Sequence, residues 1–144
     1  MKKGYYKIVF FLGLIIIFSG CVKKDQENNT ITINDKKINI EIADSWPERV
    51  QGLSGRDNLC DDCGLMFIFD SKDKYSFWMK DMKFSIDIIW IDDDKIVYIV
   101  ENASLPRGDN IPSYMPVTVA NKVLEVNAEF VKKNNIKLGD IVKF

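Results

Sequence analysis

Apolar and polar residues alternate along several short stretches of the chain, which is typical of β-strands with one buried face. The first two stretches are residues 30–33 and 38–42, and the polar residues between them predict a hairpin turn. A second hairpin is predicted by residues 86–91 and 95–100, which flank three consecutive aspartates.

Two apolar runs, residues 65–69 and 88–91, show no alternation, so we expect both faces of these strands to be covered. Further strands are expected at residues 75–79, 117–120, 122–126 and 141–144. Many short strands with few helices predict a mainly β domain over residues 30–144. An antiparallel β-sandwich and a squat barrel both fit this pattern.

One or two short helices complete the predicted fold. Ser45-Trp46-Pro47-Glu48 fits a capping box, so a helix should begin there, run to about Leu53 and stop at Gly55. Asn127 is expected to cap a second helix that extends to Asn134. Residues 104–116 contain three of the four prolines and are predicted to form a loop.

The first 20 residues have the composition of a secretion signal: basic residues, then an apolar run over residues 8–18, then Ser19-Gly20. The apolar run spans about 16 Å as a helix, which is too short for a hydrocarbon core of about 30 Å. Cys21 follows directly, in a pattern that resembles the bacterial lipobox, although Phe18 replaces the preferred leucine. We therefore expect signal peptide 1–20, a diacylated Cys21, a flexible tether 21–29 and a domain held at a membrane outside the cytosol.

The composition of the chain limits the kinds of partner and of catalysis that can be expected. The predicted signal holds three lysines and no acid, so residues 21–144 carry 17 basic and 21 acidic residues. This balance argues against a nucleic-acid partner, which requires a basic surface. The chain has no histidine, which excludes Ser-His-Asp and Cys-His catalysis and removes the commonest metal ligand. No cofactor is predicted.

A series of sequence blocks resembles, in order, the bacterial and archaeal family known as domain of unknown function 192. The blocks are residues 49–56, 64–69, 77–80, 86–92 and 123–126, followed by Gly139-Asp140. The resemblance covers roughly residues 38–144, implies a jelly-roll-like β-sandwich and brings no established activity. The chain departs from the family pattern in two residues: Met82, where a small polar residue is usual, and Glu129, where glycine is common. The second departure favours a helix after residue 126.

The most distinctive local motif is Cys60-Asp61-Asp62-Cys63. A small structural disulfide is favoured, because the protein is expected outside the cytosol and two acidic residues disfavour a reactive thiolate. Free structural thiols, a redox pair and a metal site are the alternatives. No metal ligands are predicted.

Two carboxylates, Asp87 and Glu125, stand among apolar residues and therefore need partners or a solvent-facing position. They either form structural ion pairs or contribute to a polar pocket with Trp78 as its apolar wall, which suits a small molecule or carbohydrate. The predicted ligand-binding residues are Arg49, Arg56, Trp78, Lys80, Asp87 and Glu125.

The leading functional prediction is an accessory module of the cell envelope that binds a small ligand or partner, without an identified catalytic centre. One alternative is an acid–base hydrolase that uses Asp87 and Glu125, which requires their carboxyl groups to lie within roughly 10 Å in one cleft. Another is a thiol or copper(I)-handling protein, for which four methionines are candidate ligands: Met66, Met79, Met82 and Met115. Core packing is the favoured role of those methionines. The sequence does not determine the oligomeric state.

Overall fold

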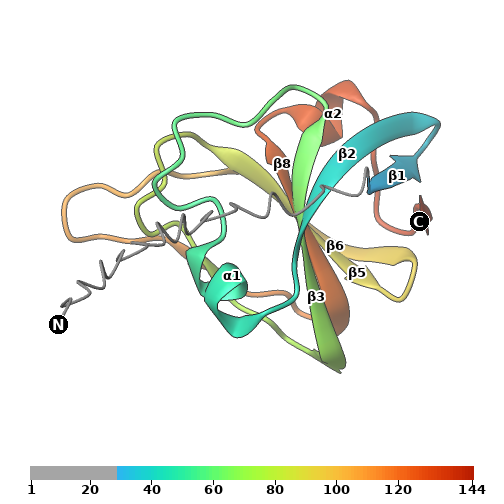
Figure 1. Cartoon of the computed structure of the whole chain (residues 1–144), viewed down its shortest axis with the longest axis horizontal. Helices are drawn as coiled ribbons and strands as arrows, with labels where there is room; N and C mark the ends of the chain where they lie inside the picture. Colours follow the sequence, from blue (N-terminus) through green and yellow to red (C-terminus); the bar gives the residue numbers. More distant parts are fainter. Residues whose placement is uncertain (1–28) are drawn as a thin grey trace, which may run out of the picture.

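A strongly curled seven-stranded sheet dominates the protein (Figure 1). The computed structural model describes residues 29–144. The predicted signal peptide, Cys21 and all but the last residue of the predicted tether lie outside the described residues. A two-stranded sheet and two short helices complete the fold, so the predicted mainly β class is confirmed.

The strands of the large sheet follow the order β6-β5-β8-β3-β2-β1-β9. Their bounds are β1 Thr30–Ile33, β2 Lys36–Ala43, β3 Cys63–Asp73, β5 Ile86–Asp92, β6 Lys95–Ala103, β8 Ala120–Asn127 and β9 Val142–Lys143. The small sheet pairs β4 (Phe77–Trp78) with β7 (Ser113–Tyr114). The helices are α1 (Trp46–Gln51) and α2 (Phe130–Lys133).

Strands β2 and β3 are the one parallel pair in the described sheets, and every other neighbouring pair is antiparallel. A parallel pair needs a long crossover connection. Residues 44–62, which include α1, make this crossover and lie beside the sheet (Figure 1). The crossover therefore determines where α1 sits relative to β3.

The two edges of the large sheet meet at one end, which makes it a squat half-barrel. Lys95 at the start of β6 forms a bridge with Ile141, just before β9. The Val142 N–H donates to the Asp94 carbonyl at 2.7 Å, and the Ile96 N–H donates to the Asp140 carbonyl at 2.9 Å. These bonds pair backbone groups that an open sheet would leave exposed at its edges.

Both faces of the central strands are buried, as the unbroken apolar runs predicted. One face carries a core that includes Leu65, Phe67, Ile88 and Trp90, and α1, the small sheet and nearby loops flank it. The other face carries a second core built largely from isoleucine, with Met66, Leu124 and the two buried residues of α2. Each strand therefore contributes alternate residues to two different cores.

The strands predicted at residues 65–69 and 75–79 differ from those observed. Strand β3 continues past residue 69 through Asp73, and the later strand is reduced to β4, which pairs with β7 and not with β3. Tyr75 marks the change of direction: its hydroxyl donates to the Ser71 carbonyl at 2.8 Å, and its own carbonyl accepts from Trp90 Nε1 at 2.9 Å. The predicted strand at residues 117–120 is also absent until Ala120, where β8 begins.

The second helix is shorter than predicted and begins later. Asn127 remains in β8, where its side-chain amide donates to the carbonyls of Leu59 and Cys60 and is therefore not available as a helix cap. Glu129 takes the N-cap position with a left-handed backbone, φ +66°. Glycine adopts this conformation without strain, so the turn expected from the family pattern is retained despite the glutamate.

Candidate ligand-binding site

Helix α1 separates two hollows on one side of the protein, and its capping box fixes its start as predicted. The Glu48 N–H donates to Ser45 Oγ at 3.4 Å, and the Ser45 N–H donates to Glu48 Oε2 at 3.1 Å. Helical spacing then places Trp46, Arg49 and Val50 along one hollow. The two polar residues Glu48 and Gln51 line the other.

Arg49 ties α1 to the sheet through neutral groups rather than through an ion pair. Its Nη1 donates to the Ile68 carbonyl at 2.9 Å and also to the Asp44 carbonyl. Its guanidinium lies 5.2 Å from the centre of the Phe69 ring, a cation–π distance. These contacts orient the guanidinium while leaving Nε and Nη2 without hydrogen bonds among residues 29–144.

The hollow beside Arg49, which we call the aromatic groove, encloses about 200 Å³. Trp46 and Trp78 both contribute to it, and they are 72% and 50% exposed. Large aromatic side chains usually bury most of their surface, so two exposed tryptophans at one hollow make it a candidate binding surface. The lining residues are Trp46, Arg49, Val50, Phe67, Phe69, Tyr75, Ser76, Phe77 and Trp78.

Lys80 extends the aromatic groove at Trp78. Its Nζ lies 5.5 Å from the centre of the Trp78 ring. Arg49, Trp78 and Lys80 are therefore three of the six predicted site residues that the structure places along one surface.

Asp87 lies elsewhere and has a structural role. It is completely buried, and its two carboxylate oxygens accept from the backbone N–H groups of Asn102 and Val131, each at 2.8 Å. Because Val131 lies in the first turn of α2, Asp87 takes over the capping that the Glu129 side chain does not provide. Asp87 therefore joins β5 to β6 and to α2.

Glu125 is buried on the other face of the sheet. Asp87 pairs with Val126, and Ile88 with Glu125, so the two carboxylates leave adjacent strands on opposite faces. Glu125 Oε2 has no hydrogen-bond partner within the described part of the chain. Burial raises the pKa of Glu125 to about 8, against an opposing attraction from Arg56.

Glu41, which the sequence analysis overlooked, completes a polar row with Arg56 and Glu125. Glu41 pairs with Leu65 on β3, and Leu65 pairs with Glu125 on β8, so both glutamates flank one leucine on the same face. Arg56 donates to both oxygens of Glu41, at 2.7 and 2.8 Å, and these hydrogen bonds lower the pKa of Glu41. No sequence pattern singled out Glu41, which simply occupies a polar position in an alternating strand.

The second hollow beside α1 encloses about 240 Å³ and is lined by Glu41, Gly52, Arg56 and Leu65 among others. Glu125 does not line it. A Cβ built on Gly52 would lie 3.9 Å from Glu125 Oε2 and 3.4 Å from Phe67, which places the carboxyl group beneath the end of α1. The buried acid is therefore close to this polar hollow but not open to it.

The sulfur-containing residues of the described part of the chain do not converge. Cys60 and Cys63 form a disulfide, with their Cα atoms 5.1 Å apart. Met66 belongs to one core, Met79 and Met82 belong to the other, and Met115 is exposed. Among residues 29–144, no three acidic or cysteine residues are grouped as metal ligands.

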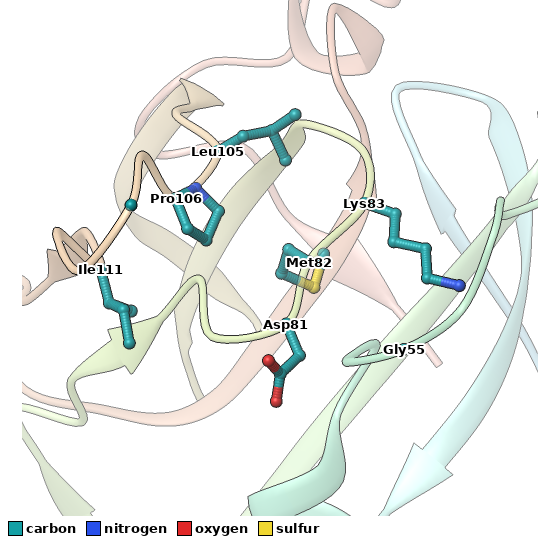
Figure 2. Close-up of a pocket in the computed structure, with 8 residues that line it drawn as sticks. Gly55, Asp81, Met82, Lys83, Leu105, Pro106 and Ile111 are labelled. Carbon is teal, nitrogen blue, oxygen red and sulfur yellow. The ribbon is translucent and has the colours of Figure 1, made fainter.

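A third hollow, about 510 Å³, lies between the loop 104–112 and the turn at residues 81–83 (Figure 2). Its lining includes the apolar residues Leu105, Pro106 and Ile111, which face the turn that carries Asp81 and Lys83 (Figure 2). Lys83 is paired with Asp57 at 2.6 Å. Met82, at the family position that is usually small and polar, is buried in the core beneath this hollow.

Comparison with known proteins places the chain in a family. The model of domain of unknown function 192, described as uncharacterized ACR, matches residues 29–144. The chain belongs to this family. No match was found among curated proteins.

Two solved structures share the fold of this family member. One is a protein of unknown function from Novosphingobium aromaticivorans, with 26% identity, a TM-score of 0.73 and coverage of 80% of this chain and 84% of the other. The other is a "putative transcription regulator" from Sinorhizobium meliloti, with 30% identity, a TM-score of 0.66 and coverage of 74% and 81%. Neither description assigns a ligand.

The six predicted site residues therefore do not form one pocket. Arg49 and Trp78 line the aromatic groove, and Lys80 lies next to it, with its Nζ 5.5 Å from the centre of the Trp78 ring. Arg56 and Glu125 belong to the polar row on the other side of α1, and Asp87 lies on the opposite face of the sheet. Trp46 and Glu41 were not among the predicted site residues. A tryptophan directly after the capping serine of a predicted helix was the available signal for Trp46.

Proposed function

We propose that the protein is a lipid-anchored accessory module of the cell envelope that holds a small ligand in the aromatic groove. The observation that carries the proposal is the pair of exposed tryptophans, Trp46 and Trp78, at one aromatic hollow. Indole rings provide flat apolar surfaces on which sugar rings and other flat groups stack. Hydrogen bonds to the carbonyls of Asp44 and Ile68 already hold the Arg49 guanidinium in place.

The envelope location rests on the N-terminal sequence, with its apolar run, its small residues and Cys21. None of the helices within residues 29–144 has the length and hydrophobicity needed to cross a bilayer. Mass spectrometry of the native protein tests the location. We expect a chain that begins at Cys21 and carries diacylglycerol, whereas a chain that retains residues 1–20 without lipid would contradict it.

Competing functions have less support. The hydrolase hypothesis needed Asp87 and Glu125 in one cleft, and these carboxylates face opposite sides of the sheet. The copper(I) hypothesis needed converging methionines, which are divided between two cores and the surface. We do not extend transcription regulation to this chain, because residues 21–144 carry more acidic than basic residues.

Ligand binding can be tested with saccharides, peptidoglycan fragments and other flat small molecules, by thermal shift and tryptophan fluorescence. Trp78→Ala should abolish the response to any ligand held in the groove. Phe144→Ala is a matched control, because Phe144 is 61% exposed and also carries a lysine, Lys122, 5.0 Å from its ring centre. A ligand response that survives Trp78→Ala and Trp46→Ala unchanged would assign the site elsewhere.

A further inference from the structure

Within residues 29–144, one cation and no anion line the aromatic groove. Arg49 is the charged residue among the lining residues, and the others are aromatic, aliphatic or a serine. Residues 21–144 have an excess of acidic residues, so a groove without a carboxylate differs from the rest of the chain. The chemistry of the groove therefore opposes a cationic ligand and favours an anionic one.

Helix α1 produces this separation of charge. Residues 46, 49 and 50 line the groove, at the spacing of one helix face. The acidic residue of the helix, Glu48, is held by the capping box and lines the polar hollow on the other side. The two sides of a six-residue helix thus present different chemistry.

Arg49 retains donors for a ligand. Both hydrogen bonds that its guanidinium forms within residues 29–144 use Nη1, and Nε and Nη2 make none there. A planar guanidinium with two free nitrogens on one edge matches the two oxygens of a carboxylate. Its orientation by Ile68 and Asp44 reduces the entropy lost when it binds.

Two aromatic rings of the groove already form cation–π contacts with side chains of the protein. Arg49 lies over Phe69, and Lys80 lies over Trp78, at 5.2 and 5.5 Å from the ring centres. A quaternary ammonium or other cationic ligand would meet charge repulsion from both side chains. Carboxylates, in contrast, gain attraction from both side chains.

We propose that the groove binds an acidic saccharide, with one sugar ring against the two exposed tryptophans and with carboxylates at Arg49 and Lys80. This inference rests on the binding function proposed above. The groove holds about 200 Å³ and is open, so it suits one ring of a chain that continues over the surface. The ligand class is a saccharide whose rings carry carboxyl groups, such as a uronic acid oligomer.

Trigalacturonic acid and its methyl ester test the inference, because they share size and rings and differ in charge. The full-length protein in detergent is titrated with each, and tryptophan fluorescence is followed. We expect the acid to bind about tenfold more tightly than the ester, as one charge-assisted interaction provides. The preference should weaken at high salt.

Variants separate this inference from the proposed function. Lys80→Gln and Arg49→Lys should each reduce the preference for the acid several-fold, whereas Lys122→Gln, the lysine over Phe144, should not change it. Circular dichroism verifies that each variant is folded. A preference that survives in both Lys80→Gln and Arg49→Lys would overturn the assignment to these cations.

Equal or tighter binding of the ester would overturn the acidic selectivity and leave saccharide binding by the groove intact. Failure of both forms to bind would overturn the inference and, with it, saccharide binding by the groove.

Discussion

The carboxylates of Asp87 and Glu125 leave neighbouring strands of the same sheet on opposite faces. Asp87 accepts two backbone hydrogen bonds in the isoleucine-rich half of the protein. Glu125 Oε2, beneath the end of α1, has no hydrogen bond among residues 29–144. Two residues that look equivalent in the sequence therefore have different effects on stability.

Asp87→Asn should destabilise the protein by about 2 to 4 kcal/mol, because an asparagine has one acceptor oxygen for two buried N–H donors. The NH2 group of the asparagine would also face one of these N–H donors, from which it cannot accept a hydrogen bond. Urea unfolding followed by circular dichroism measures the change.

Asp70→Asn is the control for this substitution, since it makes the same chemical change at an exposed residue of β3. It should leave the free energy of unfolding unchanged. If Asp87→Asn unfolds at the same urea concentration as the wild type, Asp87 does not anchor α2.

Glu125 should make the protein less stable as the pH rises. Its pKa is about 8 in the folded state and near 4.5 in the unfolded state, so the folded state binds an extra proton between these values. The free energy of unfolding should therefore fall from about pH 5 to about pH 8, by up to 4 to 5 kcal/mol. No histidine titrates in this range, because the chain contains none.

Below this range Glu41 acts in the opposite direction. Its pKa is lowered by Arg56, so its contribution is present above about pH 4.5 and is lost as the pH falls further. Maximum stability is therefore expected near pH 5.

Glu125→Gln should flatten the dependence between pH 5 and pH 8, because the amide does not titrate. Chemical unfolding at several pH values measures this slope. Glu101→Gln, at an exposed residue of β6, should retain the wild-type slope. An unchanged slope in Glu125→Gln would show that the buried carboxyl is not responsible.

Glu129 provides a test of the family-like turn before α2. Its backbone is left-handed at φ +66°, which strains every residue except glycine and, less so, asparagine or aspartate. Its side chain accepts from Asn102 Nδ2 at 2.8 Å. Glu129→Ala loses this bond and keeps the strain, whereas Glu129→Gly loses the bond and relieves the strain.

Glu129→Gly should therefore melt several degrees above Glu129→Ala in a thermal unfolding experiment. Both variants lack the hydrogen bond of the Glu129 side chain, so the difference between their melting temperatures reports the backbone strain. If the two melting temperatures coincide, the left-handed conformation at residue 129 carries no measurable strain.

Local sequence patterns predicted much of the fold. Alternation between residues 30 and 42 predicted β1 and β2, and the apolar runs at residues 65–69 and 88–91 predicted strands buried on both faces. The capping box at Ser45 predicted the start of α1, and the predicted end at about Leu53 lies two residues beyond the observed end at Gln51. These features depend on the chemistry of near neighbours, which the sequence displays directly.

Pairing between distant strands was not visible in this way. The fold brings β4 against β7 and not against β3, because Tyr75 is held by Ser71 and Trp90. In the same way Asn127 stays in β8 because it binds the loop that carries Leu59 and Cys60. Such contacts join residues far apart in the chain, and no local pattern records them.

By itself, the sequence determined the family, the β class, the acidic balance and the position of two carboxylates among apolar residues. The tertiary structure alone decided which site residues meet: the crossover of α1 brings Trp46 and Arg49 to Trp78, and strand register sends Asp87 and Glu125 to opposite faces. The physical reason is that side chains alternate every residue along a strand. A shift of one residue in register therefore moves a carboxylate from one core to the other.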